Sequence, residues 1–136
     1  MASADAGAVN VYAIDPVPKP RMTQRDRWQR RPAVLRYRAF KDEVRLKRVA
    51  LNPDGCMVEF LLPMPKSWSK ARREQMAGQP HTQKPDLDNL VKALADACYA
   101  DDSAIHTIAA RKVWAERGEI RTRPWNWGDP WWGDFD

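Results

Sequence analysis

Short apolar runs of β-forming residues recur along the chain and are separated by turns or longer connections. Residues 9–14 (VNVYAI) are β-branched and aromatic, which is typical of a strand. Residues 56–62 (CMVEFLL) form a second run, with Glu59 on the face opposite to the alternating apolar side chains. A third run at about 104–115 is followed by ERGE and IRTR, and this pattern predicts a hairpin.

The first two strands are separated by a loop and a helix. The stretch DPVPKPRMTQRDRWQRRP contains four prolines, which exclude a helix or a central strand, so we expect a loop. A helix should begin at Pro32, because proline suits the first helical turn. Apolar residues then recur at three- and four-residue spacing and define its buried stripe: Ala33, Tyr37, Phe40 and Val44.

A second long helix is expected from about Asp88 to Tyr99. Its apolar side chains fall on one side of the helical wheel: Leu87, Leu90, Val91, Leu94 and Cys98. The connection that precedes it, 63–85, contains SKARREQMAG, which fits a short helix with Ser69 as its cap and Gly78 as its stop. Connections of this length in small domains are often functional.

The order of these elements is β-α-β-(α)-α-β-β. It predicts a mixed α/β (α+β) fold, in which helices cover one face of a small mixed sheet. We expect a frayed N-terminus at 1–8, a single domain at 9–123 and a tail at 124–136 that is rich in tryptophan and aspartate. A length of 136 residues suits one domain with its own core.

Composition favours a cytoplasmic protein without a membrane span. No apolar run approaches the roughly 18 residues that a span needs. The first residues, MASADAGAVN, lack the basic and apolar regions of a secretory signal. Cys56 and Cys98 lie in apolar segments and are expected to be buried free thiols, and with His81 and His106 they show no zinc-like spacing.

Basic residues are concentrated in one part of the chain. The formal net charge is +5, but residues 19–48 alone hold twelve Lys/Arg against three acids, a local net of +9. A solvated charged face is one interpretation, and a surface that contacts phosphates is the other. The second is favoured because solvated helices usually mix the two signs more evenly.

The stretch 84–105 (KPDLDNLVKALADACYADDSAI) gathers acids instead. Asp88, Lys92 and Asp96 are spaced at i, i+4 and i+8, so they should project from the face opposite to the apolar side. Asp86 lies just before the helix, and Asp102 follows it. Such carboxylates suit Mg²⁺, which prefers oxygen ligands. Helix capping, an i,i+4 ion-pair ladder and ordinary turn residues remain open alternatives.

The string D-x-D-N-x-x-K-x-x-x-D-A followed by D-D-S, with the preceding MPKSWSKARREQMAGQPHTQKP, resembles the phage branch of the RusA family of Holliday-junction resolvases. The similarity covers roughly residues 9–115. It implies a small homodimeric endonuclease of bacteria and phages that uses Mg²⁺ or Mn²⁺ to nick four-way DNA junctions symmetrically, in recombination and repair. A nuclease for other branched DNA and a non-catalytic nucleic-acid-binding module are the alternatives.

The resemblance also implies roles for individual residues. Asp86, Asp88 and Asp102 match the metal ligands, and Lys92 matches the catalytic lysine. Asn89 and Asp96 match supporting positions. DNA phosphates are expected to contact six basic residues: Arg21, Arg25, Lys70, Arg72, Arg73 and Lys84. The chain departs from the family in joining the helix directly to the D-D step through DACYADDS, where members often have a longer piece.

Overall fold

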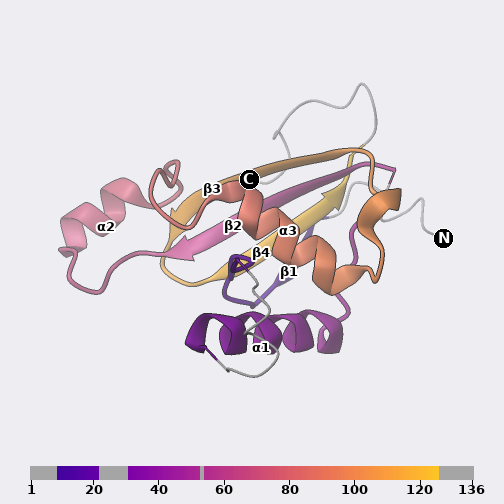
Figure 1. Cartoon of the computed structure of the whole chain (residues 1–136). Coiled ribbons are helices and arrows are strands. Elements are labelled where there is room, and N and C mark those ends of the chain that lie inside the picture. The colour runs from indigo at the N-terminus through magenta and orange to yellow at the C-terminus, as the bar shows by residue number, and fades with distance from the viewer. Residues whose placement is uncertain (1–8, 22–30, 53, 126–136) are drawn as a thin grey trace.

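The computed structural model describes residues 9–21, 31–52 and 54–125. Their elements, in chain order, are β1 (Asn10–Tyr12), α1 (Pro32–Leu46), β2 (Cys56–Pro63), α2 (Lys70–Met76), α3 (Leu87–Cys98), a 3₁₀ turn (Asp102–Ala104), β3 (Ile108–Ala115) and β4 (Glu119–Pro124) (Figure 1). This order confirms the predicted mixed α/β fold. The third strand begins later than expected, because the chain from 102 to 104 forms the 3₁₀ turn.

The four strands form one mixed sheet in the order β1-β4-β2-β3. β2 pairs in parallel with β3, so the chain between them must cross over, and α3 lies on that crossover. β4 is antiparallel to β2, and the short β1 pairs with β4 and forms the edge of the sheet opposite to β3. The β3–β4 hairpin expected from the sequence is therefore not a pair of adjacent strands, because β2 lies between them.

The main core lies between one face of the sheet and the two long helices, α1 and α3 (Figure 1). α1 contributes Tyr37, Phe40 and Val44, as its apolar stripe predicts. The fourth buried residue of α1 is Val34 rather than Ala33, which is half-buried. Positions three and four residues before Tyr37 flank the same helix face, and the larger side chain lies toward the interior.

The opposite face of the sheet carries charge. Glu59 is 3% exposed, and its carboxylate lies 2.5 Å from Nε of Arg111 on β3 and 3.7 Å from a terminal nitrogen of Arg121 on β4. Because the three residues belong to neighbouring strands, this ion-pair cluster links β3, β2 and β4 across the sheet. The position of Glu59 opposite to the apolar alternation agrees with the sequence pattern, and its two arginine partners satisfy a buried charge.

The end of β4 is packed into the domain. Trp125, which follows β4, is 4% exposed and packs on Met57 and Ala109. Its backbone N–H donates to the carbonyl of Gly55 at 3.0 Å. A Cβ atom at position 55 would lie 1.8 Å from the Trp125 carbonyl oxygen, so this close approach requires glycine. Pro124 and Trp125, the first residues of the predicted tail, thus join the sheet and core, and 126–136 lie outside the described residues.

The connection from β2 to α3 carries α2 and then runs along β3. Ser69 caps α2 by accepting from the Arg72 N–H at 3.2 Å, and Gly78 follows the helix at a φ of 81°, as the sequence predicts. The His81 N–H donates to the carbonyl of Lys112 at 3.0 Å. In Figure 1 α2 projects away from the rest of the domain, and each of its residues is at least partly exposed.

Two further sequence expectations concern the cysteines and the membrane. Cys56 and Cys98 are both free; Cys56 is buried and Cys98 is half-buried. Burial raises the pKa of each thiol to about 11. In the described part of the chain, none of the helices has the length and apolar character required to cross a bilayer.

Candidate functional site

The beginning of α3 presents two exposed carboxylates. Asp86 occupies the N-cap position in extended conformation, but its side chain accepts from Lys84 Nζ at 2.9 and 3.1 Å instead of capping the helix. Asp88 lies in the first turn of the helix, with Oδ2 3.7 Å from Nζ of Lys92. The side chains of Asp86 and Asp88 are 49% and 69% exposed, so the carboxylates are accessible to an ion or a substrate.

A third lysine, on β3, supports this end of α3 from the sheet. Lys112 of β3 directs its ammonium to the backbone carbonyls of Gln83 and Pro85, the latter at 2.6 Å. Burial lowers the pKa of Lys112, the negative charge of Asp86 opposes this shift, and Lys84 adds to it. Lys112 therefore holds the short segment that leads into Asp86, and it lies close enough to Asp86 for their charges to interact.

The aspartate further along the same helix has a different environment. Oδ2 of Asp96 lies 2.6 Å from Nζ of Lys19 and accepts from the hydroxyl of Tyr37 at 2.8 Å. Burial raises the pKa of Asp96, but the hydrogen bonds from Lys19 and Tyr37 outweigh it and hold the pKa below 3.8. Burial, followed by the Asp96 carboxylate, raises the pKa of Tyr37. The expected common face for the three residues is thus wrong for Asp96, which lies against α1.

The remaining acids follow the opposite end of α3. Asp101 accepts from the Ser103 N–H at 3.0 Å and caps the 3₁₀ turn, and this hydrogen bond lowers the Asp101 pKa. Asp102 is exposed within that turn. A twelve-residue helix such as α3 is about 18 Å long, so Asp102 and Asp88 are separated by most of its length. Figure 1 shows the two ends of α3 well apart.

The structure therefore groups the predicted ligands only in part. Within residues 9–21, 31–52 and 54–125, no three Asp, Glu, His or Cys side chains come together as a metal-binding group. Two accessible carboxylates at the start of α3 still suit Mg²⁺, which commonly takes one or two carboxylates and completes its shell with water and phosphate oxygens. Of the three predicted ligands, Asp86 and Asp88 therefore lie together at the start of α3, and Asp102 does not join them within one chain.

Arg72 and Arg73 of α2, both expected to contact DNA, differ in how many partners each already has within the protein. Arg73 donates to the carbonyls of Pro65 and Trp68 and pairs with Glu116 at 3.2 Å, so it stabilises the connection around α2. Arg72 is exposed, and its guanidinium lies 4.0 Å from the centre of the Trp68 ring. Arg72 is therefore the more accessible of the two arginines.

The other expected contacts lie at different places. Lys70 is exposed at the start of α2, and Lys84 pairs with Asp86. Arg21 is exposed beside α3, whereas Arg25 lies outside the described residues. Part of the basic segment serves the fold instead, since Arg45 of α1 donates to the Ala97 carbonyl of α3 at 3.3 Å. Net charge alone does not separate these two uses of arginine and lysine.

Sequence reasoning missed the contributions of Lys112 and Tyr37. A signal for Lys112 exists in the register of β3, where it pairs with Phe60 on the face that carries the helices. A lysine at an inward position of a strand needs a partner, and here backbone carbonyls supply it. The bond from Tyr37 to Asp96 joins residues 59 positions apart, so no local pattern reveals it.

Comparison with known proteins identifies the chain's relatives. The sequence model of one family, described as "Endodeoxyribonuclease RusA", matches residues 13–123. A protein of Bacillus subtilis (strain 168) that carries the name "Uncharacterized protein YqaN" is 30% identical in an alignment of 106 residues that covers 67% of this chain and 73% of the relative. No solved structure matches the chain significantly. Since the family match spans nearly every element of the fold, the chain belongs to the RusA endodeoxyribonuclease family, whose members act on branched DNA.

Proposed function

We propose that the protein is a Mg²⁺-dependent endodeoxyribonuclease, also active with Mn²⁺, that resolves Holliday junctions by paired symmetric nicking. It acts as a homodimer in the cytoplasm of a bacterial cell or a phage-infected host, in DNA recombination and repair. The observation that carries this proposal is the exposed pair Asp86 and Asp88 beside Lys92, at the start of α3 in a chain of this family.

Each group at the start of α3 has a chemical role in this proposal. Asp86 and Asp88 hold the metal, and Lys84 and Lys112 limit the repulsion between carboxylates by placing positive charge near Asp86. A bound Mg²⁺ would supply polarisation of the scissile phosphate and a lower pKa for the attacking water. Lys92 lies one turn further along the same face and stabilises the negative charge that develops on the phosphoryl oxygens.

Asp102 enters the proposed site from a second copy of the chain. Within one chain, most of the length of α3, which is about 18 Å in all, separates it from Asp88. A twofold dimer brings the same two surfaces together twice, so the start of α3 in one copy can meet the 102–104 turn of the other. Two equivalent sites then form in each dimer, which suits a junction with two equivalent strands to be cut.

The first experiment replaces Asp88 by Asn and follows Mg²⁺-dependent cleavage of a synthetic four-way junction. We expect cleavage to fall by at least about 100-fold while binding is retained, because the carboxylate serves the chemistry rather than the affinity. Asp42→Asn on the exposed side of α1 is the matched control and should cleave like the wild type. Unimpaired cleavage by Asp88→Asn would contradict the proposed site.

A second experiment tests the shared site by mixing two inactive variants, Asp88→Asn and Asp102→Asn, under conditions that exchange subunits. A mixed dimer contains one site with both substitutions and one with neither, so single-strand nicking should return although each variant alone is inactive. When all ligands come from one chain, every site in the mixture keeps a defect. Persistent inactivity of a verified mixed dimer would therefore exclude the shared arrangement.

Two alternative functions are separated by their substrates. A nuclease acting mainly on flaps or replication forks would cleave these in preference to a four-way junction when the substrates compete. A non-catalytic nucleic-acid-binding module would cleave no branched, duplex or single-stranded DNA at any Mg²⁺ or Mn²⁺ concentration. Binding alone does not distinguish them, because each predicts a strong dependence on salt.

A further inference from the structure

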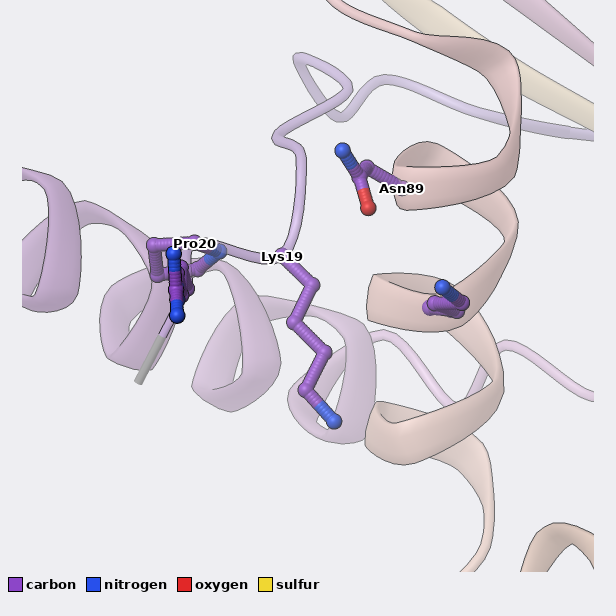
Figure 2. Close-up of a pocket in the computed structure, with 5 residues that line it drawn as sticks. Lys19, Pro20 and Asn89 are labelled. Atoms are coloured by element: carbon purple, nitrogen blue, oxygen red, sulfur yellow. The ribbon is translucent and has the colours of Figure 1, made fainter. Parts of the chain in front are cut away.

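A cavity of about 500 Å³ lies between residues 19–21 and the first half of α3 (Figure 2). Five residues line it: Lys19, Pro20, Arg21, Asn89 and Lys92. Three of them carry a positive charge, and Asn89 adds an amide that can donate or accept a hydrogen bond. The lining is therefore suited to an anion, and its open side admits a group that belongs to a larger molecule.

Lys19 fixes the loop wall of this cavity against α3. Its backbone N–H donates to the Asn89 carbonyl at 3.0 Å, and its ammonium lies 2.6 Å from Asp96. These two partners are seven residues apart on α3, which corresponds to about 10 Å of helix. Figure 2 shows the Lys19 side chain extending away from Asn89. Lys19 thus anchors the loop to α3, and its ammonium is already paired with Asp96.

The other two cations remain available to a ligand. The Arg21 side chain is exposed at the rim of the cavity. Lys92 approaches Asp88 only to 3.7 Å, which is longer than a hydrogen bond, so its ammonium can donate to an incoming anion. A guanidinium and an ammonium around an amide match the oxygens of a phosphate, to which arginine can donate two parallel hydrogen bonds.

Lys92 belongs both to this cavity and to the carboxylate pair at the start of α3. An anion held in the cavity therefore lies next to the reacting phosphate of the proposed function. We propose that the cavity binds the phosphodiester adjacent to the scissile one on the cut strand, with Arg21 as its main contact. This inference rests on the proposed nuclease function for the identity of the strand.

The first test measures salt-dependent binding to a four-way junction in an Asp88→Asn background, which leaves the DNA intact. Arg21→Gln is compared with Arg117→Gln, an exposed arginine in the β3–β4 turn. We expect Arg21→Gln to weaken binding about tenfold and to reduce the slope of log K against log salt by about 0.9, the value for one phosphate contact. Arg117→Gln should change neither quantity. Equal slopes for the two variants would overturn the proposal.

The second test locates the phosphate by replacing single phosphates near the cut with uncharged methylphosphonates. In the wild type, neutralising the adjacent phosphate should slow cleavage about tenfold. In Arg21→Gln, the same methylphosphonate should not slow cleavage further. The same sensitivity in both proteins would overturn the assignment. Absence of cleavage by the wild type would contradict the proposed nuclease function but would not affect the first test. The salt dependence is measured by binding, so it still decides whether Arg21 contacts a phosphate.

Discussion

Asp88 and Asp96 occupy the same helix, eight residues apart, in opposite environments. Asp88 is exposed and only loosely approached by Lys92, whereas Asp96 is partly buried and bound at short distance by Lys19 and Tyr37. A carboxylate whose oxygen already has two strong partners would have to lose them to bind a metal. The contrast supports the proposal that an ion binds at the beginning of α3, whereas Asp96 packs against α1 near the end of the helix.

The helical repeat explains why the two aspartates diverge. Positions four residues apart are offset by about 40° around an α-helix, so Asp96 is rotated about 80° from Asp88. This rotation turns Asp96 toward α1, where it accepts a hydrogen bond from Tyr37. An i, i+4, i+8 pattern therefore indicates a shared face over one turn, but it becomes unreliable over two.

We expect the largest difference between the two aspartates when each is replaced by asparagine. Asp88→Asn should lower cleavage at least about 100-fold and change the free energy of unfolding by no more than about 0.5 kcal/mol. Asp96→Asn should leave cleavage within a factor of about three and cost about 1–2 kcal/mol, because a bound and partly buried charge is lost. Junction cleavage and urea unfolding measure the two effects. A large loss of activity in a fully stable Asp96→Asn protein would reverse the assignment.

Removing the ammonium of Lys112 tests whether the first carboxylate depends on support from the sheet. Lys112→Met should lower cleavage about 10–100-fold with junction binding little changed, since the segment leading into Asp86 loses the donor to its carbonyls. Lys66→Met, at an exposed position before α2, is the control for the loss of one positive charge. Equal activities of the two variants would show that Lys112 has no positioning role.

A smaller effect is expected on the packed side of α3. Tyr37→Phe removes the hydroxyl that donates to Asp96 and should lower the free energy of unfolding by about 1–1.5 kcal/mol. Cleavage should remain unchanged. In a double-mutant cycle with Asp96→Asn, the two substitutions should be less than additive in urea unfolding, because they disrupt one network. Strict additivity would argue against coupling between these side chains.

The smallest effect is a dependence of stability on pH. The pKa of Asp96 is lower in the folded chain than the ordinary 3.8, so its ionised form stabilises the fold above pH 3.8. This contribution is lost as the pH falls through the folded-state pKa. The stability difference between wild type and Asp96→Asn should therefore be constant from about pH 6 to pH 5 and shrink below 3.8. A difference that grows on acidification would contradict the assigned ion pair.

Local patterns predicted the elements of this fold well because they depend on neighbouring residues. Pro32 at the start of α1 and Ser69 at the cap of α2 are examples, and both are found where expected. Strand order was less accessible: the position of β2 between β3 and β4 depends on pairing across the whole sheet. A turn signal such as ERGE shows only that the chain reverses, and not which strand becomes its neighbour.

In the candidate site, too, features set by local spacing were predictable from the sequence and long-range contacts were not. The first-turn position of Asp88 and the approach of Lys92 follow from helical spacing and are found in the structure. The contact between Lys19 and Asp96 depends on how a proline-containing loop crosses a helix 77 positions later, which no local pattern specifies. Lys112 is an intermediate case. Its position on the helix-covered face of β3 indicates that its ammonium needs partners, but the sequence does not identify them.

The two native thiols have a practical consequence for labelling chemistry. Burial keeps the pKa of Cys56 and Cys98 at about 11, so at neutral pH they remain protonated and react slowly with maleimides. A cysteine introduced at Gln75, on the exposed surface of α2, should therefore be modified selectively in the folded protein. A fluorophore could then be attached at that position without the removal of either native cysteine.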